Sequence, residues 1–134
     1  MLEAVNPAEA KIVEVSWGGE VTTSTAMATR IARDSAIGTG SRTNVGTQKT
    51  NPHSPTNIVL CSSTYATLQP TIVAGALFGT SWNAHGGVVR WLAAPGEEFQ
   101  VLFVTGGPAA DASIECRADV GTGTSSYSLV WEEA

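Results

Sequence analysis

The side chains that could do chemistry are few in this chain and lie far apart along it. Its two histidines, His53 and His85, fall in the turn-like segments NPHSP and NAHGG. Acid–base catalysis needs such a group beside a partner that tunes its pKa, and neither histidine has one nearby in the sequence. The adjacent pairs Glu97–Glu98 and Glu132–Glu133 cannot act as acid–base dyads within strands, since successive side chains of a strand point to opposite faces. The sequence therefore predicts no catalytic residue.

Metal and cofactor sites are not predicted either. Asp34, Asp111 and Asp119 lie where a turn or an outward strand face accounts for them, and no phosphate loop, nucleophile elbow, HExxH or EF-hand motif is present. The two cysteines, Cys61 and Cys116, have no second Cys or His at ligand spacing. We expect both to be small buried side chains, joined by a disulfide only if the fold pairs their strands.

Four tryptophans are the remaining candidates for function. Trp17, Trp91 and Trp131 lie in strand-like runs and are expected in the core. Trp82 lies in GTSWNAHGG, which reads as a loop. There it could pack within the chain, contact another subunit, or stack on a sugar together with Asn83 and His85.

The segments that must position these residues alternate with period two, as strands do. In SIECRADV, apolar residues alternate with charged ones, and KIVEVSW places Val13, Val15 and Trp17 on one face. GVVRWLA and EFQVLFVTG are apolar on both faces, which predicts central strands covered from both sides. One helical turn is expected at NPAEA, from Asn6 to Ala10.

Seven to nine such runs, at spacings of about 8–12 residues, predict an all-β fold. We expect residues 1–134 to form one antiparallel β-sandwich or jelly roll of about eight strands. A long Gly/Thr/Asn/Pro loop is expected over residues 36–56. Its composition cannot order itself by burial, so it either contacts a partner or is a mobile loop without function.

Composition limits the partners. Only 14% of residues are charged and the net charge is −5, with no cluster of Lys or Arg. Such a chain is not expected to bind nucleic acid. No signal peptide is recognisable, and no apolar run approaches the roughly 20 residues that span a bilayer. We therefore expect synthesis in a host cytoplasm and no membrane contact. The low charge is typical of extracellular or virion β-proteins, or of a surface buried against other subunits.

The layout resembles that of short structural proteins of tailed bacteriophages. The resemblance rests on TTSTAMATRIAR, on the long polar loop, on the Trp and proline-led turn in VVRWLAAPGEEFQV, and on the polar final strand SYSLVWEEA. It implies a jelly-roll virion protein without catalytic residues that assembles with copies of itself, commonly as a trimer.

On this basis we expect a capsid decoration (cement) protein, located in the virion, that binds the major capsid protein and stabilises the outer head surface. A tail- or fibre-associated module that binds a receptor or glycan is the alternative. A small β-barrel enzyme such as a cupin is a third possibility, but it would need a clustered metal set that the sequence lacks.

Two segments are predicted to make the contacts. The apolar segment Met1–Ala10 could act as an extended arm, for which strand addition is a common binding mode, and Gly38–Pro55 is the second contact segment. The predicted contact residues also include Trp82 and Asn83 from GTSWNAHGG. The full set is Leu2, Val5, Pro7, Arg42, Asn44, Asn51, His53, Trp82 and Asn83.

Overall fold

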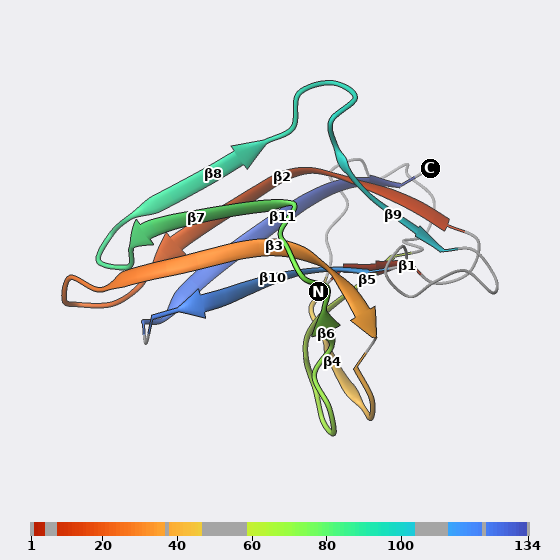
Figure 1. The fold of residues 1–134 in the computed structure, drawn as a ribbon, viewed down its shortest axis with the longest axis horizontal. Helices are drawn as coiled ribbons and strands as arrows, with labels where there is room; N and C mark the ends of the chain where they lie inside the picture. Colours follow the sequence, from red (N-terminus) through yellow and green to blue (C-terminus); the bar gives the residue numbers. More distant parts are fainter. Residues whose placement is uncertain are drawn as a thin grey trace.

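The structure, a computed structural model, describes residues 2–4, 8–36, 38–46, 59–103, 113–121 and 123–133. These residues form no helix, and their strands make two antiparallel sheets that pack against each other (Figure 1). The all-β prediction is confirmed, and two packed antiparallel sheets are the layers of a sandwich. Within these ranges, no helix is long and apolar enough to cross a membrane.

One sheet has seven strands, and β3 pairs with two of them in succession along one edge. Residues 26–31 of β3 pair with β7, and residues 34–36 pair with β6. In spatial order the strands are β4 (Arg42–Asn44), β5 (Val59–Tyr65), β1 (Leu2–Ala4), β10 (Ser113–Val120), β3 (Ala26–Ala36) and then β6 (Thr71–Ile72) and β7 (Phe78–Asn83).

The other sheet has four strands and is built around β2. Residues 8–12 of β2 pair with β9 and residues 14–18 with β8, while β11 lies along the opposite side. Its strands are β11 (Ser125–Glu133), β2 (Ala8–Gly19), β8 (Val88–Leu92) and β9 (Phe99–Phe103). Both β8 and β9 are edge strands of this sheet, so the prediction that they are central and covered on both faces is wrong.

The core lies between the sheets, where each contributes its inward-facing side chains. Burial of a large apolar side chain stabilises a fold by about 1.5–3 kcal/mol. The core residues are Ala10, Ile12, Val15, Trp17, Ile31, Val101, Ile114 and Cys116.

A row of aromatic rings joins the two layers of this core. Trp17 stacks on Phe78 with ring centroids 6.0 Å apart, and Phe78 lies 6.3 Å from Trp91. Trp91 in turn stacks on Phe99 at 4.1 Å. Trp131 also packs against the core, so the expectation of core positions for Trp17, Trp91 and Trp131 is confirmed.

A β-bulge changes which residues of β2 face inward. Val130 pairs with Glu14 but Trp131 pairs with Ile12, so Val13 is an extra residue in β2. Because of it, Ile12 and Val15 are both buried, whereas strict alternation would put them on opposite faces. The predicted inward position of Val13 is therefore wrong, while those of Val15 and Trp17 are right.

The expected helical turn at residues 6–10 is also wrong as far as the structure describes it. Residues 8–10 begin β2, and Ala10 is completely buried in the core. Pairing with β9 and β11, together with burial, outweighs the local capping signal. Asn6 and Pro7 lie outside the described residues.

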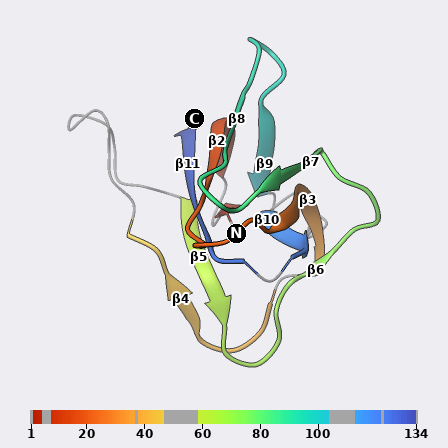
Figure 2. The ribbon, with the colours of Figure 1, turned by 90° about the vertical axis from the view of Figure 1, so that its left-hand side faces the viewer.

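The long loop predicted for residues 36–56 is partly strand. Ala36 still belongs to β3, and β4 pairs with β5 at the side of the sandwich (Figure 2). Thr39 forms a further bridge with Leu68. Thr39 and residues 42–44 thus pair within the chain, and residues 37 and 47–56 lie outside the described part.

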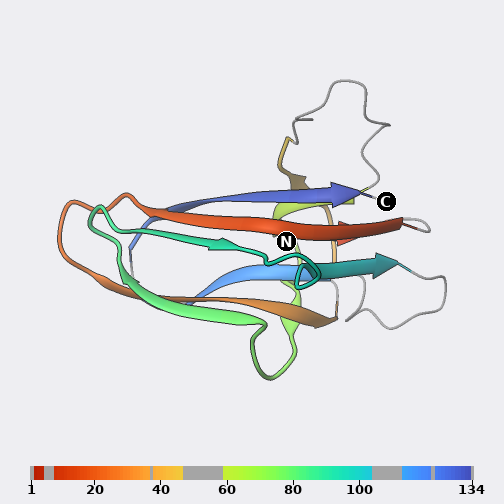
Figure 3. The same ribbon diagram turned by 90° about the horizontal axis from the view of Figure 1, so that it is seen from above.

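Three connections between the sheets meet at one end of the molecule, on the left in Figures 1 and 3. The chain crosses from β2 to β3, from β7 to β8 and from β10 to β11 there. Backbone hydrogen bonds join these connections, from Gly19 N to Gly87 O at 3.0 Å and from Glu20 N to Thr124 O at 3.1 Å.

Candidate functional site

The structure places the predicted contact residues in separate regions and does not gather them into one site. Leu2 lies in β1, Arg42 and Asn44 lie in β4, and Trp82 and Asn83 end β7. The other four predicted residues lie outside the described part of the chain; they are Val5, Pro7, Asn51 and His53.

The described part of the predicted arm is built into the chain's own sheet. Leu2 pairs with Cys61 of β5 on one side and with Ile114 of β10 on the other. Both edges of β1 are therefore occupied, and residues 2–4 offer no open edge to which a partner strand could add. β1 also separates the strands that carry Cys61 and Cys116.

Trp82 is not in a loop, as the sequence suggested, but in β7. Its ring packs against the core, and its Nε1 is buried without a hydrogen-bond partner. Of the three roles considered for Trp82, the structure shows packing within the chain.

Asn83 and His85 hold the connections at this end together. The Asn83 Oδ1 accepts from the backbone N–H of His85 at 2.9 Å, and its Nδ2 donates to Ser24 Oγ at 2.7 Å. The His85 Nδ1 lies 3.0 Å from the Val21 carbonyl oxygen. Gly87 leaves room for this turn, since a Cβ there would lie 2.0 Å from the Asn83 carbonyl oxygen. These polar side chains therefore have structural partners.

A group of charged side chains lies on the outward face of β3 and β10, away from the core. Asp34 is completely buried, and neither of its carboxyl oxygens has a hydrogen-bond partner. Ser113 and Glu115 of β10 lie beside it. The sequence had assigned Asp34 to a turn or an outward strand face; it is on that face, but it is covered.

Burial is the main reason that Asp34 resists ionisation. It raises the pKa of this carboxyl group to about 6, and the negative charge of Glu115 acts in the same direction. The neighbouring Ser113 hydroxyl opposes the shift and lowers the pKa in part. Asp34 and Glu115 thus form a carboxyl pair in which Asp34 takes up a proton near neutral pH.

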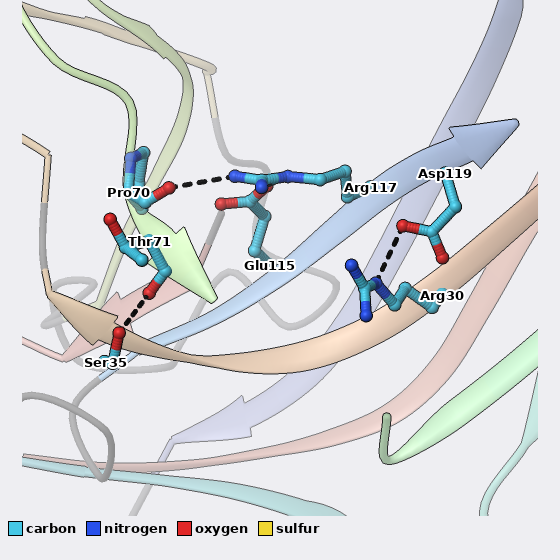
Figure 4. Close-up of polar contacts among 7 residues, drawn as sticks. All are labelled: Arg30, Ser35, Pro70, Thr71, Glu115, Arg117 and Asp119. Atoms are coloured by element: carbon cyan, nitrogen blue, oxygen red, sulfur yellow. Dashed lines mark hydrogen bonds and ion pairs between the residues drawn. The ribbon is translucent and has the colours of Figure 1, made fainter. Parts of the chain in front are cut away.

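Pro70, the residue before β6, forms part of the cover over this face (Figure 4). The Arg117 Nη2 donates to the Pro70 carbonyl oxygen at 2.9 Å, and Ser35 Oγ donates to the Thr71 carbonyl oxygen at 2.9 Å. Pro70 itself is buried. Arg117 thus holds Pro70 over the face, while the Ser35 bond joins β3 to its neighbouring strand β6.

Two ion pairs complete this covered face. Arg117 Nε binds Glu115 Oε1, and Arg30 Nε lies 2.8 Å from Asp119 Oδ1 (Figure 4). Alternating charges along β3 and β10 bring these side chains together across the sheet. Asp34 is inaccessible to solvent, so its carboxyl group is not exposed for contact with a ligand. The chemistry available to this carboxyl group is proton uptake. The described residues contain no group of three or more His, Cys, Asp or Glu side chains placed to hold a metal ion.

The outward face of the four-stranded sheet is different, because it is open and partly aliphatic. Val88 is 76% exposed and Leu92 62% exposed, since Val89 and Trp91 between them face the core. Leu102 of β9 and Val130 of β11 are also exposed on this face. The apolar outward positions of β8 and β9, which suggested a cover on both sides, meet no such cover among the described residues.

Two ion pairs lie on the same face: Lys11 Nζ is 3.7 Å from Glu9 Oε1, with Glu9 opposite Leu102, and Arg90 pairs with Glu14. Arg90 Nε and Nη2 donate to the two carboxylate oxygens of Glu14 at 2.7 and 2.8 Å. The pair lowers the pKa of Glu14, chiefly through this hydrogen bond. Glu14 lies between Leu92 and Val130 across the three strands. We refer to Val88, Leu92, Leu102 and Val130 as the aliphatic face.

Comparisons with protein-family models, with curated proteins and with solved structures found no match to this chain.

Proposed function

We propose that this chain is a structural protein of a bacteriophage virion, a jelly-roll decoration protein that binds the outer surface of the head. In this role it stabilises the capsid by bridging neighbouring capsid subunits and performs no catalysis. The viral setting rests on the resemblance of the sequence to short phage structural proteins.

The aliphatic face is the observation that carries this proposal. Two runs that are apolar on both sides form β8 and β9, yet their outward residues Val88, Leu92 and Leu102 are exposed in the isolated chain. Exposed apolar side chains that gather on one face mark protein contact sites. The charged side chains between these residues are paired with one another, Glu9 with Lys11 and Glu14 with Arg90.

The glycan-binding alternative loses the residue on which it depended. It required Trp82 to face a sugar, but this ring packs against the core and Asn83 binds the neighbouring connections. We therefore retain decoration of the head as the proposed function.

Copy number per particle tests the proposal directly. Quantitative mass spectrometry of purified virions should give a count comparable with that of the major capsid protein. A few copies per particle would move the protein to the tail. Complete absence from virions would overturn the viral setting itself.

The binding surface is tested by adding purified variants to heads that lack the protein. We expect Leu92→Glu to weaken head binding, whereas Val120→Glu, with the same charge change at a residue that is 65% exposed in the other sheet, should bind as the wild type does. Equal binding by both variants would show that the aliphatic face is not the contact.

A further inference from the structure

Four buried side-chain oxygens without a hydrogen-bond partner lie together on the outward face of β3 and β10. They are both carboxyl oxygens of Asp34, the Ser113 hydroxyl and Oε2 of Glu115. The register of these strands places Asp34 opposite Ser113, with Glu115 next on the same face. Burying an ionised carboxylate without a partner is costly, whereas a protonated carboxyl group can donate its hydrogen to a neighbouring oxygen. This arrangement therefore suits a neutral Asp34.

Residues 70–73, which we call the strap, close this face at Asp34. Pro70 lies over the face, where its carbonyl oxygen accepts from Arg117 (Figure 4). The strap then continues as β6, in which Ile72 pairs with Asp34. The strap thus borders the buried carboxyl residue both over its face and along the sheet, so opening the strap would admit water to Asp34.

Little holds the strap in place. β6 has two residues, and just after it the Val73 N–H donates to the Arg33 carbonyl oxygen at 2.9 Å. Within residues 66–77 only Pro70 is buried, and none of these residues is charged. Segments with few buried contacts open locally at a lower free energy than that of global unfolding. The strap is therefore the part of this face that can open while the rest of the sandwich stays folded.

We propose that the strap is a pH-controlled latch, closed while Asp34 is protonated and opened when Asp34 ionises. Opening lets water hydrate the carboxylate, which relieves the cost of burying its charge. Neither the strap nor Asp34 belongs to the aliphatic face, so this inference depends neither on the viral setting nor on the proposed function.

The charged groups on the same face of β10 and β3 do not neutralise an ionised Asp34. The negative charge of Glu115 opposes its ionisation, and Arg117 is paired with Glu115. Farther along the face, Arg30 and Asp119 pair with each other. The two cations of this face thus have carboxylate partners other than Asp34.

The remaining charged neighbours lie on other elements or on the opposite face. Arg33 is next to Asp34 in β3, but it lies opposite Ile114 of the core, on the other face. Glu3 of β1 occupies the position opposite Ser113. Burial is the largest cause of the raised pKa of Asp34, and the positive amino terminus lowers this pKa to a smaller extent. On balance the surroundings of Asp34 favour the protonated form.

The direction of the switch follows from linkage. The pKa of Asp34 is about 6 in the closed fold, and hydration on opening returns it towards its ordinary value of 3.8. The closed form therefore binds the proton more tightly, so the ratio of open to closed strap rises with pH between these values and levels off above 6. The expected rise in this ratio from pH 4 to pH 8 is roughly 50-fold.

Hydrogen exchange of the Val73 amide measures the open fraction, because this N–H loses its acceptor when the strap opens. After correction for the intrinsic pH dependence of exchange, the protection factor of Val73 should fall roughly 50-fold between pH 4 and pH 8. Low urea should change this protection little, because opening the strap exposes little surface. Exchange that follows urea with the full slope of global unfolding would overturn the proposed local opening.

Two variants separate the proton from the attachment of the strap. Asp34→Asn keeps the shape of the side chain but cannot ionise, so the protection of Val73 should be the same at every pH. Ser35 is exposed, and its hydroxyl donates to the Thr71 carbonyl oxygen. Ser35→Ala should therefore lower the protection about 2- to 10-fold at every pH and leave the pH dependence in place.

Two other results would contradict the proposal. One is a protection factor of Val73 that stays constant from pH 4 to pH 8 in the wild type, which would mean that the strap stays closed whatever the charge of Asp34. The other is a pH dependence that survives in Asp34→Asn, which would assign it to another group. Because these experiments use the purified chain alone, their failure would leave the proposed role in the virion untouched.

Discussion

Two Arg–Glu ion pairs, one on the outward face of each sheet, show how differently these faces are built. Arg117 and Glu115 lie beneath the segment at Pro70, with side chains 34% and 12% exposed. Arg90 and Glu14 form the better-aligned bidentate pair, but the Arg90 side chain is 62% exposed. Both pairs join an Arg to a Glu, and the pair with the weaker geometry is the one that is covered.

The chain covers part of the outward face of the seven-stranded sheet itself and leaves that of the four-stranded sheet open. Arg117 holds Pro70 over a face that contains Asp34 and Glu115. Over the face that contains Val88 and Leu92, no described segment is attached. A face that the fold must cover is covered from within the chain, whereas the open face is available to a partner.

The largest expected effect comes from breaking the covered ion pair. Arg117→Ala should lower the free energy of unfolding by about 3 kcal/mol, because it leaves Glu115 without its cation beside buried Asp34 and releases the Pro70 carbonyl. Urea denaturation at neutral pH measures this change. A loss below about 1 kcal/mol would mean that the cover does not keep this face dry, and the difference between the two faces would disappear.

The second effect is a pH dependence of the free energy of unfolding, which only the covered face should produce. The pKa of Asp34 is about 6 in the folded chain and its ordinary value is 3.8, so the folded state takes up a proton before the unfolded state does. Stability contributed by this group is therefore present at low pH and is lost as pH rises through 6. Relative to the wild type, Asp34→Asn should be more stable at pH 8 by about 2 kcal/mol, and this advantage should vanish near pH 4.

Glu97→Gln is the control, because Glu97 is exposed in the connection between β8 and β9, outside the covered face. Denaturation curves for the three proteins at pH 4, 6 and 8 would show the effect. An advantage of Asp34→Asn that stays constant with pH would mean that the proton is not taken up at Asp34.

Period-two patterns predicted the strands well but could not show what lies over them. The alternation in SIECRADV correctly predicted that Ile114 and Cys116 face the core. The sequence assigned Asp34 to a turn or an outward strand face, and nothing local indicated that Pro70 would lie over that face. Cover is supplied by distant segments, so it depends on topology rather than on local pattern.

The bulge at Val13 and the positions of β8 and β9 were missed for related reasons. A bulge adds one residue without any composition signal in IVEV, and it changes which neighbours face inward. In GVVRWLA, apolar outward residues predicted a central strand because burial on both sides is the usual cause. Here the strand lies at an edge, and this mismatch is itself the signal that indicated a contact surface.

A smaller effect is expected from the exposed ion pair. Arg90→Ala should lower the free energy of unfolding by no more than about 1 kcal/mol, the usual range for exposed pairs. High salt should reduce this effect further, because solvent-exposed charges are screened. Measured beside Arg117→Ala in the same buffer, it compares an exposed Arg–Glu pair with a covered one. Equal losses for the two variants would show that cover does not determine the strength of these pairs.

The smallest effect on the isolated chain is expected at Leu92. It distinguishes two reasons for an apolar outward residue, which are folding of the chain and contact with a partner. If Leu92 served folding, Leu92→Ser would cost about 2 kcal/mol or more, as truncation of a buried leucine does. Because Leu92 is already 62% exposed in the folded chain, we expect a change within about 0.5 kcal/mol in urea denaturation. A large loss in the monomer would mean that the chain covers this face in solution. A small loss, combined with weaker binding to a partner, would mean that β8 keeps its outward leucine for contact rather than for folding.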